Sequence, residues 1–208
     1  MKKLDSRSIN RPFRRIDPHM TASSDPFSES IRERALRIRE QGPVAVAALY
    51  DLASARLVRF AATITRNRHD AEDAVAAALL KVVADPSTLA EARAPWPYLL
   101  CMIRNEALVI LRRKRRWSLA QGLIDLVTWT RVDELEREES IREVWLALRR
   151  LPTEQSEVIV LKIWEEFTFH QIGEVLGIPP ATAASRYRAG LSKLSTALLP
   201  SSKEVPHE

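Results

Sequence analysis

Two helices and the short turn between them are specified near the end of the chain, and this pattern constrains the fold more than any other. Thr168 and Gln171 have the spacing of a capping box, in which the threonine side chain accepts from the backbone N–H of Gln171 and the glutamine side chain reaches back. Gly177 suits the left-handed position that ends a helix, and Pro180 suits the first turn of the next helix. The pattern therefore predicts helices at 169–176 and 180–198.

The second of these helices begins only four residues after the first ends, so the two must cross steeply. Phe167 before the cap and Ile172 after it are placed to close as a hydrophobic staple. Such a crossing is the helix-turn-helix geometry that lays the second helix in the major groove of DNA. A plain helical hairpin is the alternative interpretation of the same spacing.

The predicted second helix has an apolar stripe and, near its N-terminal end, a polar face. Residues at helical spacing form the stripe: Ala183, Tyr187, Leu191, Leu194 and Leu198. The polar face carries the predicted DNA-binding residues: Thr182, Ser185, Arg186 and Arg188. Their position is where a recognition helix meets base edges and phosphates. On a plain hairpin the same arginines would simply be solvated.

The remainder of the 208-residue chain is also rich in helix formers. It has five glycines and almost no alternating apolar and polar runs, so the predicted fold class is all-α. We predict two small helical domains joined by a flexible linker, the C-terminal one a helix-turn-helix. The predicted boundaries are a disordered basic N-terminal extension at 1–27, a helical domain at 28–116, the linker at 117–138, the helix-turn-helix domain at 139–199 and a tail at 200–208. Met20 is an alternative start to Met1.

Local signals divide both domains into helices. Ser28 is expected to cap a helix at 29–41, and apolar periodicity predicts further helices at 44–65, 70–84 and 98–116. A loop with three prolines is expected at 86–97. In the second domain, helices are predicted at 139–150 and 154–165, before the pair described above.

A basic segment ends the predicted helix at 98–116. It carries five consecutive cations, Arg112, Arg113, Lys114, Arg115 and Arg116, and lies downstream of Arg104 and Asn105. The helix dipole favours cations at a C-terminus by about 0.3–1 kcal/mol each, which explains one or two of them. The others repel one another unless an anion neutralises them, so the segment indicates nucleic acid binding rather than a solvated face. Trp96 and Tyr98 are expected to pack rather than to stack on bases.

An acidic cluster, Asp70, Glu72 and Asp73, opens the predicted helix at 70–84. Two interpretations are open: carboxylates that complement the helix dipole, with Asp70 as the N-cap, or a docking surface for a basic partner. Local physics alone favours the first. No carboxylate pair is backed by a histidine or a glycine-rich loop, so neither a catalytic site nor a cofactor is predicted.

Other residues narrow the class of protein. Cys101 lies in an apolar run and is expected to be a buried core thiol, and the scattered histidines offer no metal spacing. No apolar run approaches the roughly 20 residues of a membrane span, and no secretory signal is recognisable. A cytoplasmic protein without membrane insertion is therefore expected.

Taken in order, the motifs resemble those of a bacterial RNA polymerase sigma factor of the extracytoplasmic-function type. The first group is Leu49-Tyr50, Leu57 to Ala61, Asp70 to Val75, Tyr98-Leu99, Ile103 to Asn105 and Leu111 to Arg113. The second is Leu148 to Pro152, Val158 to Leu161, Ile172, Gly177-Ile178, Thr182 and Ser185-Arg186. The resemblance covers about 44–116 and 140–198. The chain departs from the family pattern at Ala76-Ala77, Leu79, Pro95-Trp96-Pro97, Val109 and Ala183-Ala184.

The resemblance implies a role for each segment. Region 28–116 would bind core RNA polymerase and melt the minus-ten element, and 139–199 would bind the minus-thirty-five element. The expected partners are the beta-prime and beta subunits of polymerase, promoter DNA and an anti-sigma factor. In the family the acidic helix docks on a coiled coil of beta-prime, which makes Asp70, Glu72 and Asp73 polymerase-binding candidates. The basic segment with Arg104 and Asn105 would contact the minus-ten region.

Two other classes of protein remain as alternatives. The first is a helix-turn-helix transcriptional regulator that acts without polymerase, which does not account for the basic helix at 98–116. The second is a small nuclease, which lacks a metal-binding carboxylate cluster on a plausible pocket. Capture of the large polymerase subunits from a bacterial lysate would separate all three.

Overall fold

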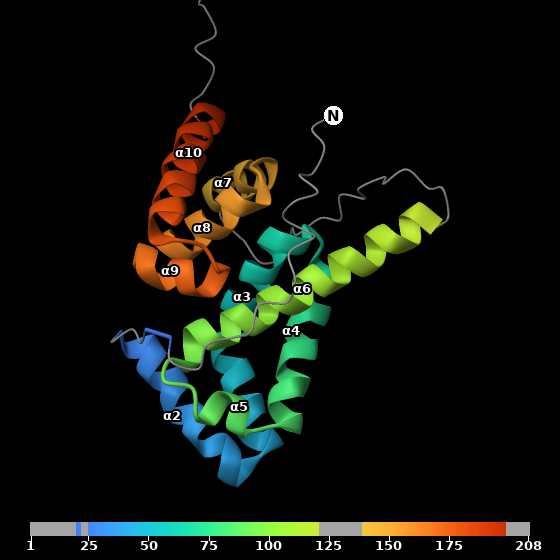
Figure 1. Ribbon diagram of the computed structural model, residues 1–208, viewed down its shortest axis with the longest axis vertical. Helices are drawn as coiled ribbons and strands as arrows, with labels where there is room; N and C mark the ends of the chain where they lie inside the picture. Colours follow the sequence, from blue (N-terminus) through green and yellow to red (C-terminus); the bar gives the residue numbers. More distant parts are fainter. Residues whose placement is uncertain (1–19, 22–24, 121–138, 199–208) are drawn as a thin grey trace, which may run out of the picture.

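The computed structural model describes residues 20–21, 25–120 and 139–198, and every regular element within them is an α-helix (Figure 1). The first domain contains α2 (Pro26–Gln41), α3 (Pro43–Thr65), α4 (Arg68–Ala84), α5 (Ser87–Ala90) and α6 (Pro95–Ala120). The second contains α7 (Glu139–Arg150), α8 (Thr153–Ile163), α9 (Phe169–Leu176) and α10 (Pro180–Leu198). The predicted all-α class with two helical domains is confirmed. Most of the predicted N-terminal extension, the linker from 121 onward and the tail lie outside the described residues.

The helix-turn-helix forms as its capping residues predict. Thr168 Oγ1 accepts from the backbone N–H of Gln171 at 3.2 Å, and Gln171 Oε1 accepts from the backbone N–H of Thr168 at 2.9 Å. Gly177 ends α9 in the left-handed conformation, with φ +70°. The predicted ends of α7, α9 and α10 coincide with those observed, because local side-chain and backbone caps determine them.

Two predicted caps in the first domain are wrong. The carboxylate of Asp25, rather than Ser28, caps α2 by accepting from the N–H of Ser28 at 3.0 Å, and Pro26 occupies the first helical turn. Asn67, rather than Asp70, caps α4 by accepting from the N–H of Asp70 at 3.0 Å. In both cases the true N-cap lies three residues before the predicted one. The reason is that an N-cap side chain accepts from the backbone N–H three residues further on, so the predicted residue is the donor and not the cap.

Helix α6 is longer than predicted at both ends. It begins at Pro95, within the expected loop, because prolines in a first turn lose no helical hydrogen bond. The same loop also contains the short helix α5. At its other end α6 continues to Ala120, into the first part of the predicted linker. Figure 1 shows this end projecting beyond the other helices of the domain.

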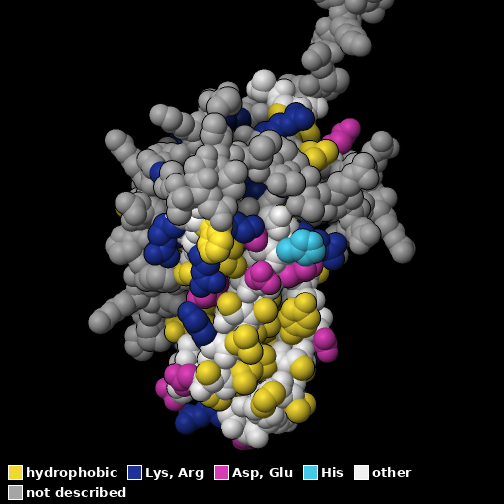
Figure 2. Space-filling model, turned by 90° about the vertical axis from the view of Figure 1, so that its right-hand side faces the viewer, with side chains coloured by type: hydrophobic (Ala, Val, Ile, Leu, Met, Phe, Trp, Pro, Cys, Tyr) yellow, Lys and Arg dark blue, Asp and Glu magenta, His cyan; other side chains and the backbone are white. Residues whose placement is uncertain are grey.

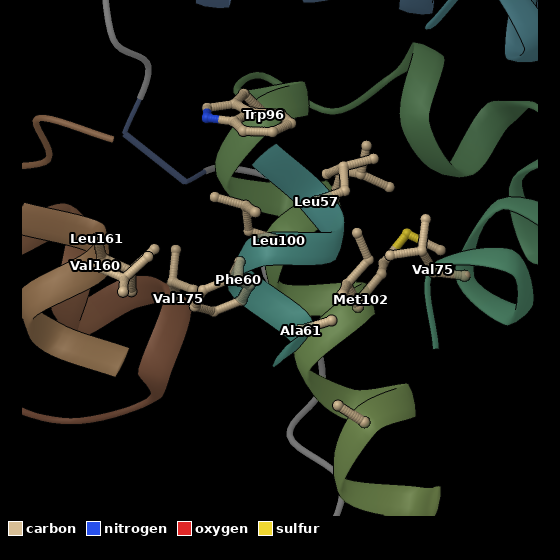
Figure 3. Packing of buried hydrophobic residues seen from close by; sticks show 14 of the residues in the cluster. Leu57, Phe60, Ala61, Val75, Trp96, Leu100, Met102, Val160, Leu161 and Val175 are labelled. Atoms are coloured by element: carbon tan, nitrogen blue, oxygen red, sulfur yellow. The ribbon is translucent and has the colours of Figure 1, made fainter. Parts of the chain in front are cut away.

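The hydrophobic core continues from one domain into the other. Helices α3 and α6 of the first domain lie against α8 and α9 of the second. Figure 3 shows Phe60 of α3 and Val175 of α9 pointing toward each other across this boundary, and both side chains are buried. Cys101 is also buried, as expected of a core thiol. The two domains therefore share one packed interface in this structure.

None of the helices in the described ranges is both long and apolar enough to cross a membrane.

Candidate nucleic-acid interface

Helix α10 is held on the second domain by one side and exposes the other. Ala183 is fully buried, and Tyr187 packs edge-on against Phe169 with ring centroids 5.7 Å apart. Ser185 and Arg188 are exposed, and the other two predicted DNA-binding residues, Thr182 and Arg186, are half-buried. The N-terminal half of α10 thus leaves Ser185 and Arg188 open to solvent and Thr182 and Arg186 partly so.

The predicted apolar stripe of α10 is right at its start and wrong at its end. Leu194 is buried, but Leu198 is 38% exposed. Gly190 of the same helix is buried although it was not part of the predicted stripe. A Cβ on Gly190 would lie 2.7 Å from Cδ1 of Ile159 in α8. The glycine allows α8 and α10 to approach more closely than two side chains would.

Gly173 is a structural residue of the turn that the sequence interpretation missed. Its carbonyl oxygen accepts from the N–H of Gly177 at 2.8 Å and from the N–H of Ile178 at 3.0 Å. A Cβ on Gly173 would stand 2.6 Å from the carbonyl oxygen of Ile178, and that oxygen belongs to the backbone. Only glycine leaves room for this turn. The sequence feature that could have revealed this role is the presence of a glycine inside a predicted helix.

The basic segment at the end of α6 is largely exposed. Arg113, Lys114, Arg115 and Arg116 are exposed, and Arg112 is half-buried, with Nε donating to the carbonyl oxygen of Leu108 at 3.2 Å. Lys114 Nζ lies 2.7 Å from Oδ2 of Asp70. One predicted DNA contact is thus paired with one predicted polymerase contact.

The three acidic residues of α4 have different surroundings. Asp70 is buried, whereas Glu72 is half-buried with Oε1 2.8 Å from Nε of Arg68. Asp73 is exposed, and Leu80 of the same helix is 68% exposed. Figure 2 shows acidic side chains between a basic group above and a hydrophobic area below, on the side of the molecule where α4 lies. Of the three acidic residues, only Asp73 is fully exposed.

Arg104 and Asn105 precede the basic segment in α6, and Arg104 contacts the second domain. Arg104 Nε is 2.6 Å from Oε1 of Glu157 in α8, and both side chains are nearly inaccessible, at 12% and 2% exposure. Burial alone would lower the pKa of Arg104, but the adjacent carboxylate of Glu157 raises it above the usual value. Asn105 is buried. The predicted minus-ten residues are therefore separated: the basic segment is at an exposed helix end, Arg104 is in an interdomain ion pair and Asn105 is buried.

No metal site accompanies this surface: the described residues contain no group of three or more histidines, cysteines or carboxylates arranged to hold an ion. Trp96 is 1% exposed and is a packing residue, as predicted.

Two family models match successive parts of the chain. Residues 49–117 match sigma-70 region 2, and residues 141–194 match sigma-70 region 4. The RNA polymerase sigma factor CarQ of Myxococcus xanthus is 28% identical over 159 residues, which cover 76% of this chain and 91% of CarQ.

Solved structures share the fold. The sigma factor RpoE of Bartonella quintana, in complex with the anti-sigma factor NepR, has a TM-score of 0.62 at 21% identity, covering 72% of this chain and 93% of RpoE. CnrH, in complex with the cytosolic domain of CnrY, has a TM-score of 0.54 at 18% identity, covering 83% of this chain and 97% of CnrH.

The order of a region 2 domain and a helix-turn-helix region 4 domain defines the class of protein as a bacterial sigma factor. The chain belongs to the sigma-70 family and is of the extracytoplasmic-function type. Its function is to bind core RNA polymerase and to direct promoter recognition and transcription initiation.

Proposed function

We propose that this sigma factor reads the minus-thirty-five element with the N-terminal half of α10 and the minus-ten element with α6. The observation that carries the proposal is the exposed face of α10, on which Ser185 and Arg188 are accessible to solvent. The turn before this helix is fixed by the capping of α9 and by Gly173. A helix presented in this way fits the major groove, and its first turns reach base edges.

Within α10, different residues have different roles. Arg186 reads a guanine, because a guanidinium forms two parallel hydrogen bonds with the O6 and N7 atoms of that base. Thr182 and Ser185 lie on the same side and contact neighbouring bases. Arg188, which is exposed, contacts a phosphate and contributes affinity rather than sequence preference.

In the first domain, the basic segment binds the phosphates of the minus-ten region. Its members are Arg112, Arg113, Lys114, Arg115 and Arg116, and Arg104 and Asn105 join them in the DNA-bound state. The exposure of Arg113 to Arg116 supports this assignment, since clustered exposed cations on one helix end attract a polyanion.

Helix α4 docks on the polymerase. Asp73 is the central contact, supported by Glu72, and the exposed Leu80 extends the same surface. Asp70 contributes indirectly, because its carboxylate holds Lys114 rather than facing solvent. The partners are the beta-prime and beta subunits, so the protein works in the cytoplasm, where bacterial polymerase is found. It acts as a regulator rather than an enzyme and needs no cofactor.

An anti-sigma factor is a further expected partner. RpoE and CnrH were each solved in complex with a second protein, NepR for RpoE and the cytosolic domain of CnrY for CnrH. By analogy, this chain is held inactive by such a protein until a signal releases it.

Transcription in vitro tests the proposal. Core polymerase with this protein should produce transcripts from a library of promoters, and core polymerase alone should not. A barcode in the transcribed part of each template identifies the active promoters, whose sequences define both promoter elements. DNA binding by the protein alone, without capture of the large polymerase subunits, would instead support a regulator that acts without polymerase.

A further inference from the structure

The boundary between the two domains contains charged side chains that promoter recognition does not explain. Two glutamates of the second domain, Glu157 and Glu165, are buried. Each faces an arginine of the first domain, Arg104 and Arg56 respectively. Burial of charge is costly unless the charges are paired, so these pairs specify how the domains fit together.

The Arg104–Glu157 pair masks a residue with a proposed DNA contact. The carboxylate of Glu157 lies 2.6 Å from Nε of Arg104, at hydrogen-bonding distance. A guanidinium binds carboxylates and phosphates with the same donors. Glu157 therefore occupies a donor of Arg104 that a DNA phosphate could otherwise use.

Glu165 makes the second interdomain contact, with a segment of α6 that departs from the family pattern. Its Oε2 accepts from the indole N–H of Trp96, in the Pro95-Trp96-Pro97 segment, at 2.9 Å. Arg56 Nε lies 3.5 Å from the same oxygen, and Arg56 also donates to the carbonyl oxygen of Trp164 at 2.9 Å. The guanidinium of Arg56 in turn lies 3.9 Å from the ring centre of Phe27.

Backbone contacts reinforce the same boundary. Arg66, at the turn between α3 and α4, donates to the carbonyl oxygen of Leu151 at 2.8 Å, and Arg149 donates to the carbonyl oxygen of Arg66 at 2.8 Å. Near the N-terminus, the backbone N–H of Thr21 donates to Oε2 of Glu174 in α9 at 2.9 Å. Helix α10 packs mainly on α7, α8 and α9 of its own domain.

We propose that Arg104, Glu157, Arg56, Glu165 and Trp96 form an interdomain lock that keeps the free sigma factor closed and its minus-ten surface incomplete. The proposal deepens the promoter-binding function above and rests on it. Opening of the lock returns Glu157 and Arg104 to water and makes Arg104 available to DNA. The minus-thirty-five face of α10 stays accessible in both states, so the lock acts on the first domain.

The asymmetry between the two states makes the lock testable. Replacing Glu157 with glutamine leaves Arg104 buried without a charged partner in the closed state. In the open state both positions are hydrated, so the same replacement costs little there. Glu157→Gln should therefore shift the population from closed to open without unfolding either domain.

Distances between spin labels would measure this shift. Labels are attached at Arg37→Cys in α2 and Ser192→Cys in α10, two exposed positions on different domains, in a Cys101→Ala background. The parent protein should show mainly short distances, and Glu157→Gln should raise the ratio of long to short distances at least tenfold. Arg56→Gln should act in the same direction from the first domain, without altering the second. The control Glu91→Gln removes an exposed pair with Arg39 within the first domain and should change nothing.

Binding of fluorescent single-stranded DNA of random sequence gives a second readout. The affinity should rise severalfold in Glu157→Gln and remain unchanged in Glu91→Gln, which removes the same charge. Unchanged distances in both Glu157→Gln and Arg56→Gln, with native helicity, would overturn the lock. Capture of core polymerase by the same variants separates the two proposals: open variants that fail to bind polymerase contradict the sigma role and leave the lock standing.

Discussion

The ammonium group of Lys114 lies 2.7 Å from the carboxylate of Asp70, which ties the basic end of α6 to the first turn of α4. Asp70 is thereby occupied within the molecule, although it belongs to the acidic cluster expected to bind polymerase. Lys114 remains 58% exposed, so the pair holds the basic segment in place without removing it from solvent. The ion pair therefore connects the proposed DNA-binding segment of α6 directly to the proposed polymerase-binding helix α4.

Reversal of the charge at Asp73 should weaken polymerase binding. In Asp73→Arg, attraction to a basic partner becomes repulsion across the interface, and we expect the affinity for core polymerase to fall by tenfold or more. Circular dichroism should remain native because the side chain is exposed. The control Glu33→Arg makes the same reversal at an exposed position of α2 and should bind normally. Equal affinities of the two variants for core polymerase would show that the acidic cluster has only a structural role.

A methyl group at Gly173 should disturb the helix-turn-helix. Its Cβ would stand 2.6 Å from the carbonyl oxygen of Ile178, so the turn must move, at a cost of about 1–3 kcal/mol. Gly173→Ala should lower the melting temperature of the second domain and weaken binding to minus-thirty-five DNA. Gly42→Ala is the control: its φ of +55° strains the first domain, but nothing lies within 4 Å of its Cβ position, so the stability of the second domain and minus-thirty-five DNA binding should be unchanged. Normal DNA binding by Gly173→Ala would show that the turn tolerates the shift.

The sequence predicted the second domain better than the first, and the reason is local. The capping box joins Thr168 to Gln171, and the C-terminal cap joins Gly177 to Gly173. Each of these pairs spans about one helical turn. In the first domain several polar residues compete for each cap. Asp25 and Asn67 were therefore missed in favour of Ser28 and Asp70, each three residues further on.

Contacts between domains could not be predicted in this way. Glu157 is 53 residues from Arg104, and nothing in either neighbourhood specifies the other. The Pro95-Trp96-Pro97 departure was visible in the sequence, but its partner Glu165 emerges only when α6 and the end of α8 are brought together. Sequence patterns thus indicated which residues could bind DNA, and the fold showed that Arg104 is occupied by a carboxylate.

The closed state should be favoured by mild acid through Glu165. Burial raises the pKa of this carboxyl, and the nearby Asp25 adds to the rise, against the lowering effects of Arg56, the Trp96 hydrogen bond and Arg59. In an open state the hydrated carboxyl returns toward its ordinary value of 4.5. A raised pKa in the closed state means that the contribution of Glu165 is fully present below pH 4.5 and is lost as the pH rises through the raised value.

Interdomain distances measured as the pH is lowered from 7 toward 5 would check this sign. The closed population should increase, and Glu165→Gln, which cannot ionise, should show a smaller dependence on pH. The Glu91→Gln variant corrects for a change of charge elsewhere in the first domain. A closed population that falls on acidification in the parent but not in Glu165→Gln would reverse the assigned direction.

The recognition helix allows base preference and affinity to be separated. Arg186→Ala should relax the preference at one or two positions of the minus-thirty-five element, because a good bidentate contact contributes about 1–3 kcal/mol of discrimination. Arg188→Ala should weaken all sequences about equally, since a phosphate contact carries no sequence information. Selection from promoters randomised at the minus-thirty-five element, transcribed by the reconstituted polymerase, measures both effects. If Arg186→Ala selects the same sequences as the parent, base reading belongs to Thr182 and Ser185, which lie on the same side of α10 one turn or less before it.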